Sequence, residues 1–561
     1  MVSREPEPNN SILDDRVRAG QATGTPALAP PLATDHNGGR ATKAEAKMSQ
    51  TLNRRKLVGA MAAVIVLGCA ATTRAAADKK SPPNIILFYT DDQGWTDTSV
   101  PMIAGRPDSC SDVCRTPHLQ RLAREGMVFS NAYSPAPVCS PSRDSILYGR
   151  TPARLHHSIL LGKANCPADA MTVPRALKAA DPDYVTAHFG KWACSPRTPE
   201  EAGFDVSDGR TDNWHGDWRT VDGRKTPLPA DDPKRIFSVT QRANDFMEQQ
   251  VVAGRPFYMR VSHYALHVGH QALEETVEKY AKAGHDENAA RYAAMTENLD
   301  TGLGMLLDKI DSLGIAHETY VIFTSDNGGG FHGNGPLRGG KASLWEGGIR
   351  VPTVMRGPGI AAGTYCDVPI AGWDFLPTFC DLAGRREPLP DGLDGGSLRP
   401  LFEHGNQGKV LRSVEPLIFH YPWFDNVPMS AIRLGDHKLV KDLNTNRFRL
   451  FDVAEDVEES RDLSKSLPEV AKRLHETLNR YLDEVNAEKL EDLRAWREET
   501  LRGWMERDRK ELAQLQERIT QTIDEKERWG LQEKARERQS RLEAHRSAME
   551  RVEKGRRVTA W

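Results

Sequence analysis

The chain has 561 residues, of which 39% are hydrophobic, so it can bury a large core and is not a small disulfide-stapled scaffold. Its 75 Lys and Arg residues nearly balance its 78 Asp and Glu residues, and the formal net charge is -3. This balance excludes a global positive field that would attract nucleic acid. An anionic ligand must therefore be bound by a local cluster of positive charges.

The chain begins with a polar stretch followed by an export signal. Residues 1–47 are rich in Pro, Ala and Gly and lack a periodic apolar face, so we expect them to be disordered or to lie upstream of the true start, for which Met48 is the candidate. In residues 48–77, a basic run precedes a short apolar core and three alanines, which predicts a signal peptide cleaved after Ala77. The apolar core is short for a bilayer span, so a membrane anchor is the weaker interpretation.

The signal predicts an exported protein, either periplasmic or extracellular. The pair Arg54 and Arg55 leaves a twin-arginine route open beside the Sec route, and the segment that ends at Cys69 resembles a lipoprotein attachment site. In an oxidising compartment, six further cysteines could form up to three disulfides or remain buried thiols. A structural zinc site is less favoured, because only one pair of cysteines is closely spaced. The six are Cys110, Cys114, Cys166, Cys194, Cys366 and Cys380.

Continuous apolar runs alternate with helical patterns through the first two thirds of the chain, which predicts an α/β fold. We expect a large, mostly parallel or mixed sheet flanked by helices, in a catalytic domain of residues 78–400. The predicted strands are 83–91, 184–190, 256–262 and 319–325, and the predicted helices include 239–252 and 289–313. Each strand ends at polar residues, and ligands gather at the carboxyl ends of such strands, so these segments should meet in one cleft.

The sequence pattern changes after residue 400, from long apolar runs and helices to short strand-like segments. Short segments at 430–434, 437–441 and 447–451 predict an antiparallel sheet, and a helix is expected at 468–484, so residues 401–486 should form a smaller subdomain. Residues 487–561 are highly charged, with apolar residues at mostly helical spacings, which predicts a long amphipathic helix or short coiled coil. Arg497 and Asp508 interrupt this stripe, so a helix folded back on the catalytic body and an oligomerisation device are equally favoured.

The residues that carry the chemistry begin at Cys139, in the string CSPSRDSILYGR. The pattern Cys-x-Pro-Ser-Arg followed by Leu, Gly and Arg is similar to the signature by which sulfatases are recognised for conversion of the cysteine to formylglycine. The resemblance extends over about residues 83–465, and several separated blocks match the family in order. These blocks are Asp91-Asp92, Cys139 to Arg143, Gly190-Lys191-Trp192, His267, Asp326-Asn327-Gly328 and Lys341.

Four oxygen-bearing side chains stand at the ends of two predicted strands: Asp91, Asp92, Asp326 and Asn327. Taken singly they could cap a helix or form a turn. Together they form an all-oxygen set suited to a hard cation, with calcium favoured and magnesium the alternative. The resemblance implies that the formylglycine at position 139 also coordinates this metal.

The resemblance further implies a catalytic cycle. The hydrated aldehyde at 139 attacks sulfur as Asp326 takes its proton, and the sulfated intermediate then expels sulfate and regenerates the aldehyde. Arg143 should hold the diol or its loop, while Lys191 and Lys341 contact the sulfate. His267 protonates the leaving oxygen and is favoured over His263 and His270 by its family position. The resemblance therefore implies a catalytic set of Cys139, Arg143, Lys191, His267 and Lys341, with Asp326 as the base.

One position departs from the family pattern. Sulfatases usually continue Gly-Lys-Trp with a histidine that contacts the diol, whereas this chain has Ala193 there. Another histidine, His156, His157 or His188, could substitute; otherwise turnover should be slow. We therefore expect breakdown of the sulfated intermediate to be rate-limiting.

The expected activity is hydrolysis of sulfate monoesters, on sulfated polysaccharides or glycosaminoglycans, with aryl sulfates as surrogates. A formylglycine-generating enzyme is the expected partner in maturation. The alternatives are a phosphate or phosphonate ester hydrolase of the same alkaline-phosphatase-like superfamily and a non-catalytic binding protein with a decayed site. The intact signature at Cys139 and Arg143 argues against both.

Overall fold

The computed structural model describes residues 81–160, 164–167, 169–194, 197–221, 224–330, 333–423 and 427–555. The predicted signal peptide, Cys69 and the polar stretch 1–47 lie outside the described residues. One compact unit comprises Pro82–Arg509 and His545–Trp561, and a second includes Lys510–Ala544. Across the described part, no helix combines the length and apolar character needed to cross a membrane.

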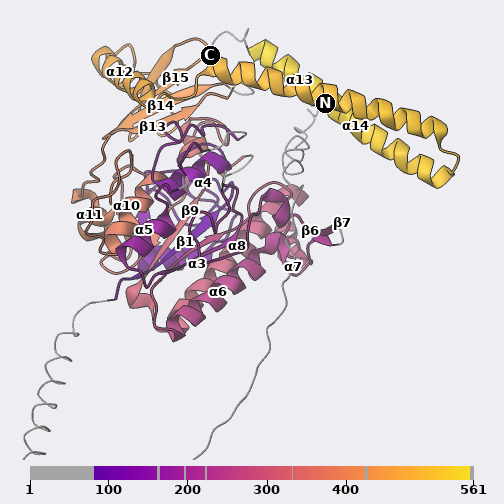
Figure 1. The fold of residues 1–561 in the computed structure, drawn as a ribbon. Coiled ribbons are helices and arrows are strands. Elements are labelled where there is room, and N and C mark those ends of the chain that lie inside the picture. The colour runs from indigo at the N-terminus through magenta and orange to yellow at the C-terminus, as the bar shows by residue number, and fades with distance from the viewer. Residues whose placement is uncertain are drawn as a thin grey trace, which may run out of the picture. The chain divides into compact units, whose positions relative to one another are not determined.

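The larger unit is built on an eight-stranded mixed sheet (Figure 1). The five strands β9, β1, β8, β4 and β5 run parallel, whereas β10 is antiparallel to both β9 and β2. The α/β prediction is thus confirmed, and the sheet is mixed at one edge. The order is β11 (Thr364–Cys366), β2 (Met127–Phe129), β10 (Val354–Arg356), β9 (Thr319–Ser325), β1 (Asn84–Thr90), β8 (Phe257–Ser262), β4 (Val185–Gly190) and β5 (Val206–Ser207).

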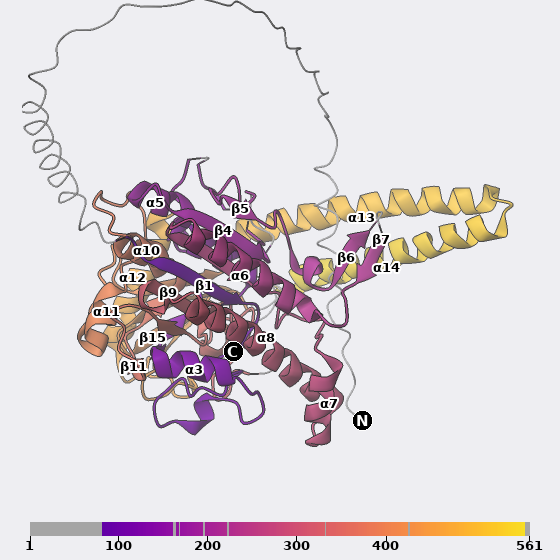
Figure 2. The same cartoon turned by 90° about the horizontal axis from the view of Figure 1, so that it is seen from below.

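Helices cover both faces of this sheet because the central strands are apolar on both sides. In β1, Ile86 and Phe88 pack into one core with α3, α6 and α8, while Ile85 and Leu87 pack into a second core with α4, α5 and α10. Figure 2 shows the sheet between these two helical layers. Each buried side chain of this size contributes about 1.5–3 kcal/mol. The helices are α3 (Pro117–Glu125), α4 (Cys139–Tyr148), α5 (Val173–Ala180), α6 (Ile236–Val252), α8 (Glu287–Ser312) and α10 (Phe375–Leu382).

Shorter elements complete the catalytic body. They are β3 (Ala132–Tyr133), β6 (Trp218–Val221), β7 (Arg224–Pro227), β12 (Ile370–Ala371), α7 (Glu274–Lys282), α9 (Glu346–Ile349), α11 (Arg399–His404) and the 3-10 turns η2 (Pro107–Ser109), η3 (Asn213–Gly216), η4 (Pro233–Arg235), η5 (Ala316–Glu318), η6 (Gly372–Asp374) and η7 (Gly405–Gln407). The strands β6 and β7 pair only with each other and form a hairpin separate from the main sheet.

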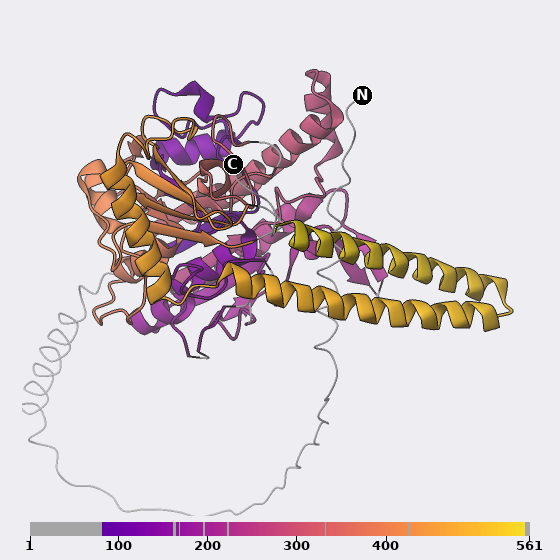
Figure 3. The same ribbon diagram turned by 90° about the horizontal axis from the view of Figure 1, so that it is seen from above.

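A four-stranded antiparallel sheet follows, as predicted, in the order β13 (Leu417–Tyr421), β14 (Met429–Leu434), β15 (His437–Asp442) and β16 (Phe448–Asp452). Strand β13 had no counterpart in the sequence prediction. One face of this sheet packs on α12 (Pro468–Glu484), as Figure 3 shows. The other face contacts the catalytic body, where Phe419 packs on Tyr133 and Trp373.

A buried ion cluster joins this small sheet to the catalytic body. The Nζ of Lys438, in β15, lies 2.8 Å from Oε1 of Glu346 and 2.9 Å from Oε1 of Glu459, and all three side chains are fully buried. Burial alone raises the pKa of Glu346, but the charges of Lys438 and Arg350 outweigh it and lower this pKa to about 2. The cluster therefore depends on its lysine.

We expect Lys438→Met to reduce the free energy of unfolding by about 3–5 kcal/mol, because it leaves the buried Glu459 without its cation and Glu346 with Arg350 alone. Urea unfolding followed by circular dichroism measures the change. Lys441→Met, in the same strand but only partly buried, is the matched control and should cost much less. Equal unfolding midpoints for the two variants would contradict this role.

The charged C-terminal region is helical, as predicted, but it forms two helices, α13 (Leu490–Gln521) and α14 (Glu525–Gly555). Within the larger unit, Nδ1 of His545 lies 3.0 Å from Oδ2 of Asp508, and the Arg497 guanidinium lies over the Trp504 ring. The two residues that interrupt the apolar stripe are therefore buried in polar contacts of their own. Within the second unit, Arg538 pairs with Glu511 at 2.8 Å.

All seven cysteines in the described part of the chain are free thiols. Cys114, Cys194, Cys366 and Cys380 are buried, whereas Cys110 and Cys166 are partly exposed. The structure thus corresponds to the buried-thiol alternative for four of the six cysteines.

Candidate active site

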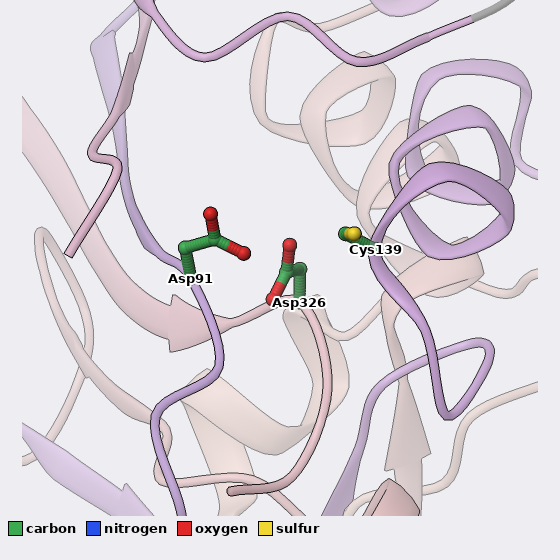
Figure 4. Close-up of side chains that lie close together, drawn as sticks. All are labelled: Asp91, Cys139 and Asp326. Atoms are coloured by element: carbon green, nitrogen blue, oxygen red, sulfur yellow. The ribbon is translucent and has the colours of Figure 1, made fainter. Parts of the chain in front are cut away.

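The acidic residues of the candidate site stand where neighbouring parallel strands end. Asp91 and Asp92 follow β1, Asp326 follows β9, and Lys191 follows β4. Figure 4 shows the carboxylates of Asp91 and Asp326 and the side chain of Cys139 close together. One ligand atom from each of these three residues lies within 4.8 Å of the other two. Segments more than two hundred residues apart in sequence thus meet at one edge of the sheet, as expected.

Local backbone geometry fixes two of these positions. Gly190 has φ +89°, and a Cβ there would lie 2.0 Å from the Ser262 carbonyl oxygen, so only glycine fits before Lys191. Asp92 also has a positive φ, +59°, which costs free energy in a residue with a side chain. Its backbone N–H donates to Oδ1 of Asp326 at 3.1 Å, which ties the ends of β1 and β9 together.

Cys139 is the first residue of α4, so its side chain lies at the positive end of the helix dipole. Its side chain is 4% exposed. Burial raises the pKa of this thiol, although the positive charges of Lys191 and Lys341 oppose the rise. The unmodified thiol is therefore protonated at neutral pH and is a weak nucleophile.

Three cations face the three carboxylates in ion pairs. The Nζ of Lys191 lies 2.5 Å from Oδ2 of Asp91, and the Nζ of Lys341 lies 2.6 Å from Oδ2 of Asp92. The two lysines thus pair with the two consecutive carboxylates that follow β1. Because both lysines also act electrostatically on Cys139, they are placed to attract an anion that binds beside it.

Arg143 forms the third ion pair and is fully buried. Its Nε and Nη2 lie 2.9 and 2.7 Å from Oδ2 of Asp326, and Nη1 donates to the Ser262 hydroxyl at 2.5 Å and to the Lys191 carbonyl at 3.0 Å. The guanidinium thus connects α4 to the ends of three strands. It therefore holds the Cys139 helix in place.

The pKa values of Asp92 and Asp326 are shifted in opposite directions. Burial, together with the charge of Asp91, raises the pKa of Asp326 to about 6. For Asp92, burial also raises the pKa, but Lys341, His267 and Lys191 outweigh it and hold this pKa well below its usual range. Asp92 is thus held as an anion, and Asp326 is the more basic of the two carboxylates.

His267 is the histidine that reaches this cluster. Its Nε2 lies 3.9 Å from Oδ2 of Asp92 and 3.2 Å from Nδ2 of Asn213. Burial lowers its pKa well below the usual value, and Lys341 lowers it further. By contrast, the ring of His263 packs on Phe88 in the core. His270, the other competitor, packs on Tyr292.

The oxygen donors fit a hard cation. Oδ1 of Asp91 and Oδ1 of Asn327 are buried and accept no hydrogen bond. Nδ2 of Asn327 donates to Oδ1 of Asp92 at 2.8 Å, which leaves its oxygen oriented away from that bond. With Asp326, the set offers oxygen ligands from carboxylates and an amide, as calcium and magnesium require.

Sequence reasoning missed several side chains at the site. Ser262, at the end of β8, could have been found from its strand position, whereas Asn213 lies in a 3-10 turn that no pattern marks. The Ser140 hydroxyl lies 3.2 Å from Nε2 of His157, and Nδ1 of His157 lies 2.7 Å from Oδ2 of Asp144. His157 was a candidate from the sequence, whereas its partners Ser140 and Asp144 follow no pattern that marks them.

Ala193 follows the Gly-Lys-Trp block with φ +44°. Three histidines were considered as substitutes. Of these, His157 contacts Ser140, the residue that follows Cys139 in the chain. His188 is buried against the ring of Trp192, and His156 lies 3.2 Å from the Val485 carbonyl oxygen.

Comparison with known proteins identifies the family. Residues 83–385 match the family model described as "Sulfatase", and residues 340–486 match "N-sulphoglucosamine sulphohydrolase, C-terminal". An ulvan-active sulfatase of Formosa agariphila is 28% identical over 442 residues, which is 72% of this chain and 82% of that protein. The N-acetylgalactosamine-6-sulfatase of Canis lupus familiaris is 31% identical over 397 residues, covering 63% of this chain and 71% of that protein.

A solved structure agrees with these matches. The crystal structure of Ps i-CgsB in complex with k-i-k-neocarrahexaose has a TM-score of 0.62 and 25% identity, and the match covers 72% of this chain and 93% of that chain. The first family model alone spans more than half of the 561 residues. The chain belongs to the sulfatase family of enzymes.

Proposed function

We propose that this sulfatase acts through a formylglycine formed from Cys139, with calcium at the adjacent acidic cluster and magnesium as the alternative ion. The observation that carries the proposal is the position of Cys139. Its side chain lies among the metal-suited carboxylates of Asp91 and Asp326 and within reach of the charges of Lys191 and Lys341. The raised pKa of the thiol supports conversion, because an unmodified cysteine would be a poor nucleophile here.

A divalent cation would give the site a net positive charge, which suits an anionic substrate. The carboxylates of Asp91, Asp92 and Asp326 are matched by Arg143, Lys191 and Lys341, so the six side chains together are formally neutral. A bound divalent cation would supply positive charge for the sulfate oxygens as a Lewis acid. Asp91, Asp92, Asp326 and Asn327 are the side chains that would hold it.

The two lysines provide the anion contact. Each has its ammonium on a carboxylate, and burial lowers the pKa of Lys191 and of Lys341 less than the surrounding anions raise it, so both stay charged. A sulfate ester placed beside residue 139 therefore meets two fixed cations that need no reorganisation. Lys341 is partly exposed and Lys191 is buried, which puts Lys341 on the solvent side of the site.

Asp326 and His267 are the proposed proton acceptor and proton donor. Asp326 is a buried carboxylate within 4.8 Å of the Cys139 side chain, so it is placed to accept the proton of the nucleophile. His267 gives a proton to the leaving oxygen. Its pKa is depressed by burial and by neighbouring lysines, and an arriving sulfate anion offsets their charge and favours the protonated ring.

The proposed substrates are sulfated polysaccharides or glycosaminoglycans. In support, one relative is named for activity on ulvan and another for N-acetylgalactosamine-6-sulfatase activity. One similar solved structure contains a neocarrahexaose. Aryl sulfates serve as small test substrates because the groups around residue 139 recognise the sulfate itself.

The proposal is tested on protein coexpressed with a formylglycine-generating enzyme. Mass spectrometry of the tryptic peptide that contains Cys139 should show the mass loss of thiol-to-aldehyde conversion. The converted protein should release sulfate from 4-nitrophenyl sulfate faster than phosphate from 4-nitrophenyl phosphate. An unconverted cysteine and no sulfate release would favour a decayed site, and faster phosphate release would favour a phosphate or phosphonate hydrolase.

Ala193 leads to a kinetic prediction. Because the usual histidine is missing there, we expect release of sulfate from the enzyme to be slower than cleavage of the ester. Stopped-flow measurement with 4-nitrophenyl sulfate should show a burst of nitrophenol equal in amount to the converted enzyme, followed by a slower steady rate. A time course that is linear from the first turnover would show that this step is not rate-limiting.

We also propose that the protein is exported, on the strength of the sequence pattern in residues 48–77. N-terminal sequencing of the mature protein from the periplasmic and extracellular fractions tests this. A mature terminus after Ala77 supports cleavage, a lipid-modified terminus at Cys69 supports anchoring, and a protein confined to the cytoplasm contradicts export.

A further inference from the structure

The side of the site that carries His267 adjoins a hairpin with paired tryptophans. The rings of Trp214 and Trp218 are stacked, with centroids 4.6 Å apart and an angle of 23° between their planes. The Nζ of Lys225 lies 4.2 Å from the centroid of the Trp218 ring and 5.5 Å from that of Trp214. Both tryptophans are partly exposed. We call these three residues the tryptophan platform.

The platform is joined to His267 through one turn. Asn213, the residue before Trp214, places its amide Nδ2 3.2 Å from Nε2 of His267. Its amide oxygen is buried and has no hydrogen-bond partner. Asp212 caps the same turn by accepting a hydrogen bond from the Trp214 backbone N–H at 3.1 Å, so the turn that carries both contacts is well defined.

Further contacts hold this segment against the loop of His267. The buried Lys234 ammonium forms an ion pair with Asp217 and donates to the Val268 carbonyl at 2.9 Å. A Cβ at Gly216 would lie 2.4 Å from the Tyr264 side chain, so the turn packs directly on that loop. The platform thus has a fixed position relative to the proposed acid, as a binding site requires.

The hairpin is also basic. Besides Lys225, it carries Arg219 and Arg224, both exposed, against one acidic residue in its sequence, Asp222. Indole rings offer flat apolar surface to the CH face of a sugar ring, and guanidinium and ammonium groups bind sulfate or carboxylate groups. A purely apolar leaving group would leave these cations unused.

On this basis we propose that the tryptophan platform binds the saccharide on the leaving-group side of the scissile ester, and that this saccharide carries further anionic groups. The inference rests on the proposed function, because His267 marks the leaving-group side only if it protonates the leaving oxygen. It narrows the substrate class to an anionic oligosaccharide or polysaccharide, rather than an aryl or other apolar sulfate.

Binding and turnover are measured separately to test this. Affinities for chondroitin 6-sulfate, ulvan and carrageenan oligosaccharides are determined by calorimetry on Cys139→Ala, with and without Trp218→Ala. Turnover of the same oligosaccharides and of 4-nitrophenyl sulfate is measured on the converted enzyme. We expect Trp218→Ala to lower kcat/KM for a bound oligosaccharide at least about tenfold more than for 4-nitrophenyl sulfate, which corresponds to about 1.4 kcal/mol.

Matched variants sharpen the result. Trp529→Ala removes a tryptophan that is 61% exposed in the second unit and should change neither activity. Lys225→Gln should weaken oligosaccharide binding and reduce its dependence on salt concentration, because one ion contact is lost. Equal losses for both substrates after Trp218→Ala would show that the platform only supports the fold.

The outcomes separate this inference from the proposed function. If the enzyme hydrolyses 4-nitrophenyl sulfate but binds none of the three oligosaccharides, the platform inference is wrong and the proposed function stands. If no ester is hydrolysed but Cys139→Ala binds an oligosaccharide through Trp218, the proposed function fails. The platform is then a saccharide-binding site, but its assignment to the leaving-group side is overturned together with the proposed function.

Discussion

Replacement of Cys139 by alanine should lower sulfate release from 4-nitrophenyl sulfate by at least about 10⁴-fold, because it removes the proposed nucleophile while the charged groups that bind sulfate remain. Cys139 lies at the start of α4 with its neighbours Arg143 and Asp326 held by an ion pair of their own, so the fold should tolerate the change. Initial rates at saturating substrate and the thermal unfolding midpoint are measured on the same preparations.

Two variants serve as controls for this result. Cys380→Ala truncates another buried thiol, in α10 and outside the acidic cluster, and should keep its activity. Cys139→Ser retains a hydroxyl that can be sulfated but lacks the second hydroxyl needed to expel sulfate, so mass spectrometry should show an inert sulfated protein. Activity of Cys139→Ala equal to that of the parent would place the nucleophile elsewhere.

The sheet and the positions of the acidic residues could be predicted because each rests on a local pattern. Strands such as 83–91 and 319–325 are continuous apolar runs, and they appear as β1 and β9, directly bonded to each other. Since parallel strands end at the same edge, the polar residues after each run had to meet. The candidate site residues follow from this rule together with the family motifs.

What the sequence did not predict depends on long-range contacts. Strand β13 is a short apolar run, LIFHY, that could have been predicted as a strand, but its place in the sheet is defined by pairing with β14. Asn213 meets His267 across 54 residues of sequence in a turn without regular structure, so no periodicity could place it. The same holds for Lys438, whose burial depends on Glu346 and Glu459 from distant segments.

The C-terminal region shows where a pattern was interpreted too simply. Arg497 and Asp508 looked like breaks in an apolar stripe, because hydrophobic spacing treats every charged residue as exposed. In the structure both side chains are buried, and Asp508 lies against His545 while Arg497 covers Trp504. A pattern based on hydropathy cannot predict that a charged side chain is buried beside a partner.

Removal of divalent cations should abolish activity and lower the thermal unfolding midpoint, and calcium should restore both. The reason is that Asp91, Asp326 and Asn327 bring buried oxygens together, two of which accept no hydrogen bond, and a cation bound only by the folded state stabilises it. At a cation concentration one hundred times the dissociation constant, the expected stabilisation is about 2.7 kcal/mol.

Asp326→Asn tests whether the effect comes from this cluster. The variant should lose most of the calcium-dependent rise in the unfolding midpoint as well as activity, because it removes one anionic ligand. Asp231→Asn, at an exposed position outside the cluster, should keep the full rise. A larger rise in the unfolding midpoint with magnesium than with calcium would assign magnesium instead. If calcium raised the midpoint equally in Asp326→Asn and Asp231→Asn, the stabilising cation would bind outside the cluster.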